Sequence, residues 1–476
     1  MEPLLLVGHH GRVVAFLQTI SFRRAAFALV ALTLCVHAQA LGHAFTWNDG
    51  TNILANDALS DPANIPSFFV EAWGASAEDA TYRARNSQYW RPIPMAIWTI
   101  QSALFGLNPL PFHAFNVLMH ALSAFLLLLF AWRLFPAPGM DRVALSLGTF
   151  AWALHPLHTE VVHVVSYGSD LLAGLFTFAG LALWLGKPGQ SKRRAAWGRS
   201  LGVPILFLCG VGSKEMAVTL PVLLFILDLC LLPASTSFGQ RTRRLAPVML
   251  TLMGYLTLRS IILEGGGQDF YAGVSASVVV YSMLDVFALY ARLLVLPWPL
   301  NPFYDWSALP PQETLWAIGP LVGLFLLVGW IVLGGLCWRR EPRLGIAFLL
   351  PLVVLIPASH IVPIIIAAAE RFLYVAACGP LLLAALACAR SSRASFWLSL
   401  MALMVLMHSG LSLVRGADWR DDRTILEANV RDWPSSFNAW YGLATLHAKE
   451  GRLDEAEAIW SRLGIRAPSA QDSPSE

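Results

Sequence analysis

Long apolar runs, separated by short polar or basic segments, recur along most of this chain. A helix needs about 20 mostly apolar residues to cross a membrane, and the runs approach that length. The pattern therefore predicts an all-α, polytopic membrane protein with about eleven transmembrane helices. Their expected positions are residues 25 to 42, 112 to 134, 143 to 160, 169 to 186, 200 to 213, 216 to 233, 246 to 264, 315 to 337, 344 to 360, 372 to 389 and 394 to 413.

The composition agrees with this fold class. Hydrophobic residues make up 56% of the chain and charged residues 13%, whereas an ordinary soluble domain has roughly 25% charged residues. The net charge of +3 creates no broad basic field, so we expect no nucleic-acid partner. The six cysteines lie in or beside apolar runs without CxxC spacing, and we interpret them as small buried hydrophobic residues.

The basic residues predict how the chain is oriented in the membrane. Lys and Arg cluster between apolar runs, and all clusters can face the cytoplasm if the run from 277 to 296 does not cross. That run is then expected to be a surface or re-entrant helix on the outer face. The segment 1 to 24 becomes cytoplasmic. The run after it is expected to be a retained anchor, although Ala38-Gln39-Ala40 resembles a signal-peptide cleavage site.

Three further segments follow from the pattern. Residues 25 to 417 form the membrane domain, whose first outer loop spans 43 to 111. Residues 418 to 466 are polar, extracytoplasmic and resemble one tetratricopeptide repeat, which is two helices joined by a Gly-containing turn. Because stacked repeats usually need three or more copies, this hairpin either binds a partner protein or packs on the outer surface without a binding role. The Ser- and Pro-rich residues 467 to 476 are expected to be disordered.

Ionisable residues gather at the predicted outer ends of the helices. Charges at membrane depth are costly and tend to be functional, so these side chains predict a polar cavity that faces outward under the first loop. Asp49 follows the first apolar run and is either a helix cap or a general base. Arg91 lies among aromatic residues and is either an interface anchor or a phosphate ligand.

Two pairs of adjacent opposite charges, Lys214-Glu215 and Glu370-Arg371, also lie at predicted outer ends. Neighbouring side chains on a helix point about 100° apart, so each member is expected to find its partner on another segment. The cations suit a phosphate, which Arg binds through two donors and Lys as a point charge. The alternative is a structural network of ion pairs that holds helix ends together.

The run His155-Pro156-Leu157-His158-Thr159-Glu160 resembles the spacing of metal ligands. Proline after the first histidine disfavours a helix at His155, so the geometry of a helical metal site is not assured. We therefore expect His155 and His158 to make structural hydrogen bonds to the first loop. A divalent metal stays a candidate cofactor.

Eight motifs follow one another along the chain. They are Phe45-Thr46-Trp47-Asn48-Asp49 with Ile53 and Asn56; Trp90-Arg91-Pro92; Leu104-Phe105-Gly106-Leu107-Asn108-Pro109 with His113 and Asn116; His155 to Glu160; Ser169-Asp170-Leu171-Leu172; Ser213-Lys214-Glu215; Pro297 with Leu300, Pro302 and Tyr304; and Glu370-Arg371-Phe372-Leu373-Tyr374. Each is weak alone. Together, and in this order, they resemble the transmembrane and tetratricopeptide-repeat-containing (TMTC-like) proteins, membrane glycosyltransferases of the C-type superfamily related to protein O-mannosyltransferases.

The resemblance covers nearly the whole chain and implies that Asp49 is the catalytic residue. We assign Asp49 as general base and Arg91, Lys214 and Arg371 as ligands of the donor phosphate. The residues expected to support them are Asn48, His155, His158, Glu160, Asp170, Glu215, Glu370 and Tyr374. Three positions depart from the family pattern. Asn48 stands where relatives often carry a second Asp, the Arg that tends to precede Ser169-Asp170 is missing, and His360 stands where an Asn is usual.

The combined prediction is a glycosyltransferase. It would move a sugar, with mannose as one candidate, from a polyprenyl-phosphate carrier to a protein or glycan acceptor on the outer face. The sequence contains no Gly-rich phosphate loop, which favours a lipid-linked donor over a nucleotide sugar. The alternatives are a transporter or flippase for a polyprenyl-linked glycan and a non-catalytic scaffold that recruits proteins through its tail.

The expected location is the bilayer of a bacterial inner membrane, with the active face periplasmic, because the chain is compact and its tail is short. The endoplasmic-reticulum membrane is the alternative.

Overall fold

The computed structural model describes residues 21–74, 88–136, 139–187, 189–263, 270–362 and 364–465. Every regular element in these ranges is helical, which confirms the all-α prediction. The tail that was expected to be disordered, 467 to 476, lies outside the described residues, as do residues 1–20 of the expected cytoplasmic segment.

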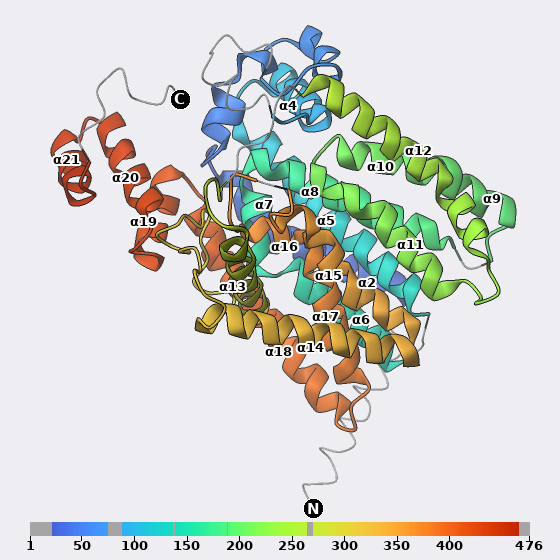
Figure 1. Cartoon of the computed structure of the whole chain (residues 1–476). Coiled ribbons are helices and arrows are strands. Elements are labelled where there is room, and N and C mark those ends of the chain that lie inside the picture. The colour runs from blue at the N-terminus through green and yellow to red at the C-terminus, as the bar shows by residue number, and fades with distance from the viewer. Residues whose placement is uncertain are drawn as a thin grey trace, which may run out of the picture.

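The elements follow one another with short connections (Figure 1). The first half contains α2 (Phe22–His37), α4 (Pro92–Phe105), α5 (Pro109–Leu134), α6 (Met140–Ala153), α7 (Thr159–His163), α8 (Gly168–Leu185), α9 (Lys192–Trp197), α10 (Val203–Val211) and α11 (Leu220–Leu231). The second half contains α12 (Phe238–Ile262), α13 (Ala276–Val295), α14 (Ile318–Arg340), α15 (Pro342–Leu355), α16 (Leu373–Ala376), α17 (Cys378–Ala389), α18 (Ala394–Asp418), α19 (Asp422–Asp432), α20 (Phe437–Lys449) and α21 (Leu453–Arg462).

Helix ends coincide with residues that favour them. The Asn108 side chain accepts the Leu110 N–H at the start of α5, and Pro109 occupies the first helical position. Ser237 opens α12 with a reciprocal capping box. At the other end of a helix, α8 stops at Gly186, whose φ of 73° is favourable only for glycine.

The described chain contains seven helices that are long and apolar enough to cross a membrane. They are Phe22–Gly42, Pro109–Leu134, Val165–Leu185, Phe238–Ile262, Ala276–Val295, Ile318–Arg340 and Ala394–Asp418. The pair Glu370–Ala376 and Cys378–Ala389, bent by 53°, makes an eighth if it counts as one span. The chain is thus an integral membrane protein, but the predicted number of about eleven spans is not confirmed.

The remaining predicted spans correspond to shorter helices, among them α6 with 14 residues and α11 with 12. The apolar runs are interrupted by single helical turns that the hydrophobic pattern does not reveal. Residues 216 to 219, expected to begin a span, instead belong to the turn η9 (Glu215–Thr219). Such turns shorten the helices and bring polar residues to their ends.

The centre of the bundle is formed by α5, α6, α8 and α17 (Figure 1). There α5 packs against α8, α2 and α6, while α6 packs along α17. Trp152, Phe130 and Phe178 fill this core and are almost completely buried. By contrast, α12 and α14 lie on the flanks and expose most of their apolar side chains, as expected of surfaces that lipid covers.

The run from 277 to 296 forms α13, which packs along α14. This helix is itself long enough to cross a membrane. The segment before α13 and the C-terminal part of the helix both contact residues 364–369, because the Phe270 N–H donates to Ile364 O at 2.8 Å and Tyr290 Oη donates to Ala369 O at 3.3 Å. That this helix lies on the outer face without crossing stays a prediction.

The cysteines are less buried than expected. All six are free thiols, and only Cys378 is buried, whereas Cys35 is exposed. The reason is that several of the helices that carry them lie at the outside of the bundle.

After the last long apolar helix come three helices, α19, α20 and α21 (Figure 1, red). The helices α20 and α21 pack against each other and are joined by a turn at Gly451, whose φ is 78°. The expected two-helix hairpin is therefore present, preceded by an additional helix. Its likeness to a tetratricopeptide repeat stays a prediction.

Candidate functional site

Asp49 lies in the first loop and is completely buried. Its Oδ2 accepts the backbone N–H groups of Thr46 at 3.2 Å and Val165 at 3.0 Å, and its Oδ1 accepts that of Ser166 at 2.7 Å. Val165 and Ser166 belong to the turn η7 (Val165–Tyr167), so one carboxylate ties the first loop to the start of α8. Burial raises the pKa of Asp49 to about 6, against the opposing effect of these hydrogen bonds.

This geometry gives Asp49 a structural role and leaves its catalytic role a prediction. A carboxylate has about four acceptor positions, and the three N–H groups occupy three of them. A substrate hydroxyl would have to reach the remaining lone pair after a movement of the loop, because the side chain has no exposed surface.

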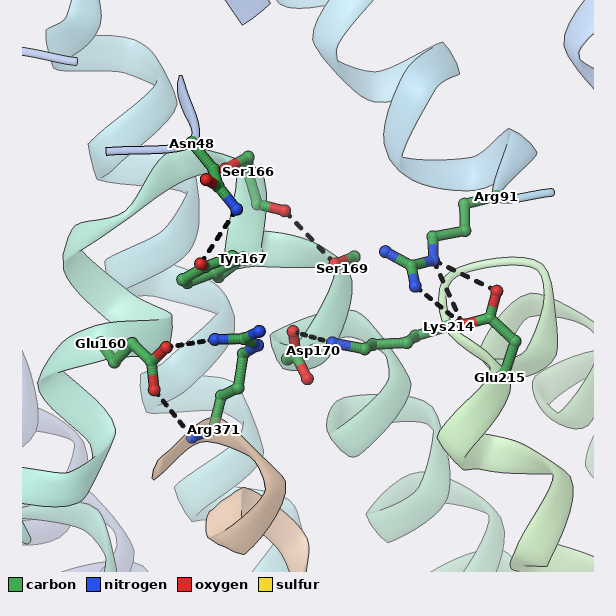
Figure 2. A network of polar contacts seen from close by, with 10 residues as sticks. All are labelled: Asn48, Arg91, Glu160, Ser166, Tyr167, Ser169, Asp170, Lys214, Glu215 and Arg371. Carbon is green, nitrogen blue, oxygen red and sulfur yellow. Dashed lines mark hydrogen bonds and ion pairs between the residues drawn. The ribbon is translucent and has the colours of Figure 1, made fainter. Parts of the chain in front are cut away.

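Asn48 connects the first loop to a cation of the site through Tyr167 (Figure 2). Its Nδ2 donates to Tyr167 Oη at 3.0 Å, and the guanidinium of Arg371 lies over the Tyr167 ring, 4.4 Å from its centroid. The residue that stands in place of a second Asp therefore acts as a hydrogen-bond donor.

Two buried ion pairs lie below these residues. Lys214 Nζ is 2.5 Å from Asp170 Oδ2, and Arg371 Nη1 is 2.5 Å from Glu160 Oε1. The Arg371 backbone N–H also donates to Glu160 Oε2 at 2.8 Å. Asp170 lies between Lys214 and Arg371 (Figure 2), so the two pairs form one polar cluster that spans α7, α8, η9 and η11 (Glu370–Phe372).

A third ion pair lies at the rim of this cluster. Arg91 donates to both oxygens of Glu215, with the closest contact at 2.9 Å, and Arg259 approaches Glu215 at 3.4 Å. The Arg91 guanidinium also lies over the ring of Tyr89 at 4.6 Å. Although burial alone would raise the pKa of Glu215, the charges of Arg91 and Arg259 lower it to about 2. Glu215 is therefore ionised at neutral pH, and its side chain remains about one quarter exposed, at 26%.

Every member of the two adjacent charge pairs has its partner on another segment, as expected. Burial lowers the pKa of Lys214 to about 8 against the effect of Asp170, and the nearby Arg91 and Arg371 act in the same direction as burial. Glu370 accepts the Asn301 N–H at 2.5 Å.

A narrow pocket opens beside the cluster, with a cavity volume of about 20 Å³. Asp170 and Arg371 give it a polar end, and most of its remaining wall is apolar or small. The lining residues are Asp170, Ala173, Gly174, Thr177, Met216, Ala217, Thr219, Val354, Arg371, Phe372, Tyr374 and Val375. The arrangement combines a cation with an apolar slot that would have to widen before it could hold a hydrocarbon chain or a sugar.

The prediction that His155 hydrogen-bonds the first loop is wrong. Its Nδ1 accepts the Leu157 N–H at 3.3 Å, and its Nε2 lies 3.3 Å from Leu294 O, ahead of the 297–309 segment. Two other histidines do contact the first loop: His113 Nε2 is 3.1 Å from Ala44 O, and His163 Nδ1 is 3.3 Å from His43 Nδ1. Pro156 is responsible, because it starts a tight turn that folds the His155 ring back onto its own backbone.

The same prediction is wrong for His158. It packs between Trp152 and Tyr374, with ring centroids 4.7 and 5.0 Å away. Among the described residues, neither ring nitrogen has a hydrogen-bond partner. The Tyr374 hydroxyl does not bond to His158, because it lies 3.0 Å from Nδ1 of another histidine, His120. Within the described ranges, no group of three or more His, Cys, Asp or Glu side chains is arranged to hold a metal ion.

Two members of the site escaped the analysis of the sequence. Tyr167 was not among the predicted site residues, although an aromatic residue beside Ser169-Asp170 at a helix start was a usable signal. Arg259 ends an apolar run, where a basic residue is normally interpreted as an interface anchor. Its pairing with Glu215 depends on how α12 packs, which no local pattern encodes.

Fold and site together define a class: an all-α integral membrane protein whose charged residues meet at one end of the bundle beside a pocket. Comparison with known proteins narrows this class of protein further. The chain is 23% identical to mouse "Protein O-mannosyl-transferase TMTC3" over 92% of this chain and 50% of that protein. It is 22% identical to Caenorhabditis elegans "Protein O-mannosyl-transferase F38B6.6" over 92% of this chain and 62% of that protein.

Mouse "Protein O-mannosyl-transferase TMTC4" is 24% identical over 89% of this chain and 64% of its own length. The predicted similarity to TMTC-like proteins is thus confirmed. The chain spans about half to two thirds of the length of these three relatives, all of which are animal proteins. No protein-family model matches the chain, and no solved structure matches it significantly.

Proposed function

We propose that the chain is a glycosyltransferase that moves a sugar, mannose in the first instance, from a polyprenyl-phosphate carrier to a hydroxyl of a protein. The observation that carries this proposal is the pocket with Arg371 and Asp170 at its polar end and Lys214 bonded to Asp170. A phosphate at that end would meet two cations, and the apolar wall would accept the first isoprene units. The names of the relatives supply the sugar and the protein acceptor.

The reaction needs one proton transfer and one charge stabilisation. The acceptor oxygen attacks the anomeric carbon while the bond between that carbon and the phosphate oxygen breaks, with inversion at the carbon. The hydroxyl proton passes to a base, for which Asp49 is the candidate, and the bonding electrons leave with the lipid phosphate. In this proposal Lys214 and Arg371 stabilise the charge that develops on that phosphate, and Arg91 assists from the rim of the cluster.

The carboxylates of the cluster keep these cations ionised and oriented before the donor arrives. Glu160 holds Arg371 and Asp170 holds Lys214. A bound phosphate would compete with Asp170 for Lys214, so release of that ion pair is part of donor binding in this proposal. We place the reaction on the outer face, periplasmic in a bacterial inner membrane or luminal in the endoplasmic reticulum.

A ligand screen tests the proposal on the purified full-length chain. Polyprenyl-phosphate mannose should raise the thermal unfolding midpoint, whereas GDP-mannose should not. The variant Lys214→Gln should weaken the apparent donor affinity about tenfold, since one charge-assisted contact contributes about 1.5–3 kcal/mol. Arg393→Gln, an exposed cation near the start of α18, is the matched control and should respond like the wild type.

The screen also separates the alternatives. A non-catalytic scaffold should show no shift with any lipid-linked sugar. A flippase should bind the donor but release no free polyprenyl phosphate when an acceptor peptide is added. A shift with GDP-mannose alone would contradict a lipid-linked donor.

A further inference from the structure

One buried carboxylate joins the C-terminal helices to the membrane domain. Asp305 Oδ1 accepts the N–H groups of Ser307 at 3.0 Å and Ala308 at 2.7 Å, which fixes its own loop. Its Oδ2 accepts from Ser436 Oγ at 3.0 Å and from the Asn438 N–H at 2.9 Å. Because Ser436 is the N-cap of α20, Asp305 supplies a second cap from a distant loop and accepts one of the backbone N–H groups that the helix leaves free, that of Asn438.

The same loop supplies the hydrogen bonds of Glu370. Oε1 of this buried carboxylate accepts the Asn301 N–H at 2.5 Å and the Tyr304 hydroxyl at 3.3 Å, while Oε2 has no hydrogen-bond partner among the described residues. A buried carboxylate depends strongly on its donors. Glu370 is adjacent to Arg371, whose backbone N–H and guanidinium bind Glu160.

Trp433, just after α19, completes the connection. Its Nε1 donates to Leu300 O at 3.2 Å, and its ring packs edge-on against Tyr304 with centroids 5.5 Å apart. A continuous set of contacts therefore runs from the start of α20 through residues 300–308 to Glu370.

The C-terminal helices also contact the other side of the site. Asp422 Oδ1 accepts the Trp47 N–H at 2.6 Å, and Arg420 O accepts the Ala44 N–H at 3.0 Å. Trp47 packs with Tyr167 and other buried apolar residues in one cluster. The C-terminal segment thus touches the loop that carries Asn48 and Asp49 as well as the loop that holds Glu370.

We propose that the C-terminal segment, residues 419–464, is a positioning element of the polar site, and that Asp305 is the positioning residue that connects them. Asp305 holds α20 against the 300–308 loop, the loop holds Glu370, and Glu370 holds the turn from which Arg371 reaches Glu160 and the pocket. The catalytic consequence of this arrangement rests on the proposed function, whereas the structural connection does not.

Hydrogen exchange on the full-length chain in detergent micelles tests the connection without an activity assay. In Asp305→Asn, an amide nitrogen replaces one carboxylate oxygen. Because this nitrogen can only donate, the N–H or O–H groups that it faces lose their acceptor. The backbone amides of Asn301 and Arg371, which donate to Glu370 and Glu160, should then exchange about tenfold faster than in the wild type. Glu457→Gln, an exposed carboxylate on α21, is the control and should leave both amides unchanged.

The proposal is overturned if the amides of α20 exchange faster in Asp305→Asn while those of Asn301 and Arg371 do not. It is also overturned if Glu457→Gln has the same effect. Should Asp305→Asn fail to fold, Trp433→Phe keeps a smaller aromatic ring beside Tyr304, removes the donor to Leu300 O and should accelerate the same two amides.

Kinetics then separate this proposal from the proposed function. Asp305→Asn should lower kcat for sugar transfer about tenfold and leave KM for the donor within about twofold, because Asp305 contacts no substrate. Faster exchange at Asn301 and Arg371 in a chain without any transferase activity would support the connection and contradict the proposed function. An unchanged kcat with faster exchange would contradict the catalytic consequence.

Discussion

At the scale of single residues, Asp49 has a structural role and a proposed catalytic role. Three backbone N–H groups make it an anchor between the first loop and η7, while its raised pKa suits a base that works near neutral pH. The two roles are compatible only if the loop moves when the acceptor binds.

The pH dependence of transfer should report the ionisation of Asp49. A base is active when deprotonated, and burial sets the pKa at about 6. We expect the rate to be half-maximal near pH 6 and to fall about tenfold per pH unit below it. A rate that stays constant from pH 7 to pH 5 would exclude Asp49 as the base.

The variant Asp49→Asn should lose transfer and about 1–3 kcal/mol of stability, since its Nδ2 would face N–H donors. Asp57→Asn, at an exposed position of the same loop, is the control for both measurements.

The wild-type pKa of Asp49 lies above the ordinary 3.8, so the folded state binds the proton more tightly than the unfolded state does. The contribution of this group to stability is therefore largest below about pH 4 and is lost as the pH rises through about 6, which thermal unfolding at several pH values measures.

A third residue-scale prediction concerns the pocket wall. A Cβ at Gly174 would lie 2.5 Å from the Tyr374 ring, whereas one at Gly254, in the lipid-facing α12, would meet nothing within 4 Å. We expect Gly174→Ala to cost about 1–3 kcal/mol and to weaken donor binding. Gly254→Ala should be neutral or slightly stabilising. Equal unfolding midpoints for the two variants would contradict this prediction, because they would show that the Tyr374 ring can move away without loss of stability.

The chemistry of the site was more predictable from the sequence than its contacts. The adjacent pairs Lys214-Glu215 and Glu370-Arg371 had to find partners elsewhere, and they do. The roles of His155 and His158 were wrong because the direction of a ring depends on the turn at Pro156 and on packing against Trp152. Asp305 carried no signal, since a single Asp in a loop is common and its partner lies 131 residues away.

At the scale of elements, the site is assembled from turns. Glu215, Glu370 and Arg371 lie on η9 and η11, and Glu160 and Asp170 lie on the first turns of α7 and α8. Lys214 and Arg91 directly precede η9 and α4, whereas Arg259 lies in the last turn of the long helix α12. Hydrophobic periodicity found the positions of the long apolar helices but did not find α4, which lies in the predicted first loop. It overestimated the length of α6, α10, α11 and α15, because a turn made of apolar residues looks like a continuation of the helix.

The pair formed by Glu160 and Arg371 should hold α7 to η11. Either Glu160→Gln or Arg371→Gln should cost about 3–5 kcal/mol, since each leaves one charge buried and unpaired, and the double variant should cost less than the sum. Glu427→Gln, which breaks an exposed pair with Arg423, should cost less than about 1 kcal/mol. Additive effects of Glu160→Gln and Arg371→Gln in chemical denaturation would contradict a direct interaction.

At the scale of the whole molecule, the membrane bundle and the C-terminal helices form one unit around the polar cluster. The sequence predicted the all-α membrane domain and the polar tail as separate parts. That the tail packs against both loops of the site depends on contacts between residues more than 100 positions apart, which a single sequence does not reveal.

The central claim is that this chain transfers mannose from a lipid-linked donor to protein. The most direct measurement is the incorporation of radiolabel from polyprenyl-phosphate mannose into protein hydroxyls by the purified full-length chain in liposomes. Wild-type protein should transfer the sugar with inversion at the anomeric carbon, Lys214→Gln should be at least about tenfold slower, and Arg393→Gln should match the wild type. Transfer that is equal in wild type and Lys214→Gln, or absent with every lipid-linked sugar, would contradict the account.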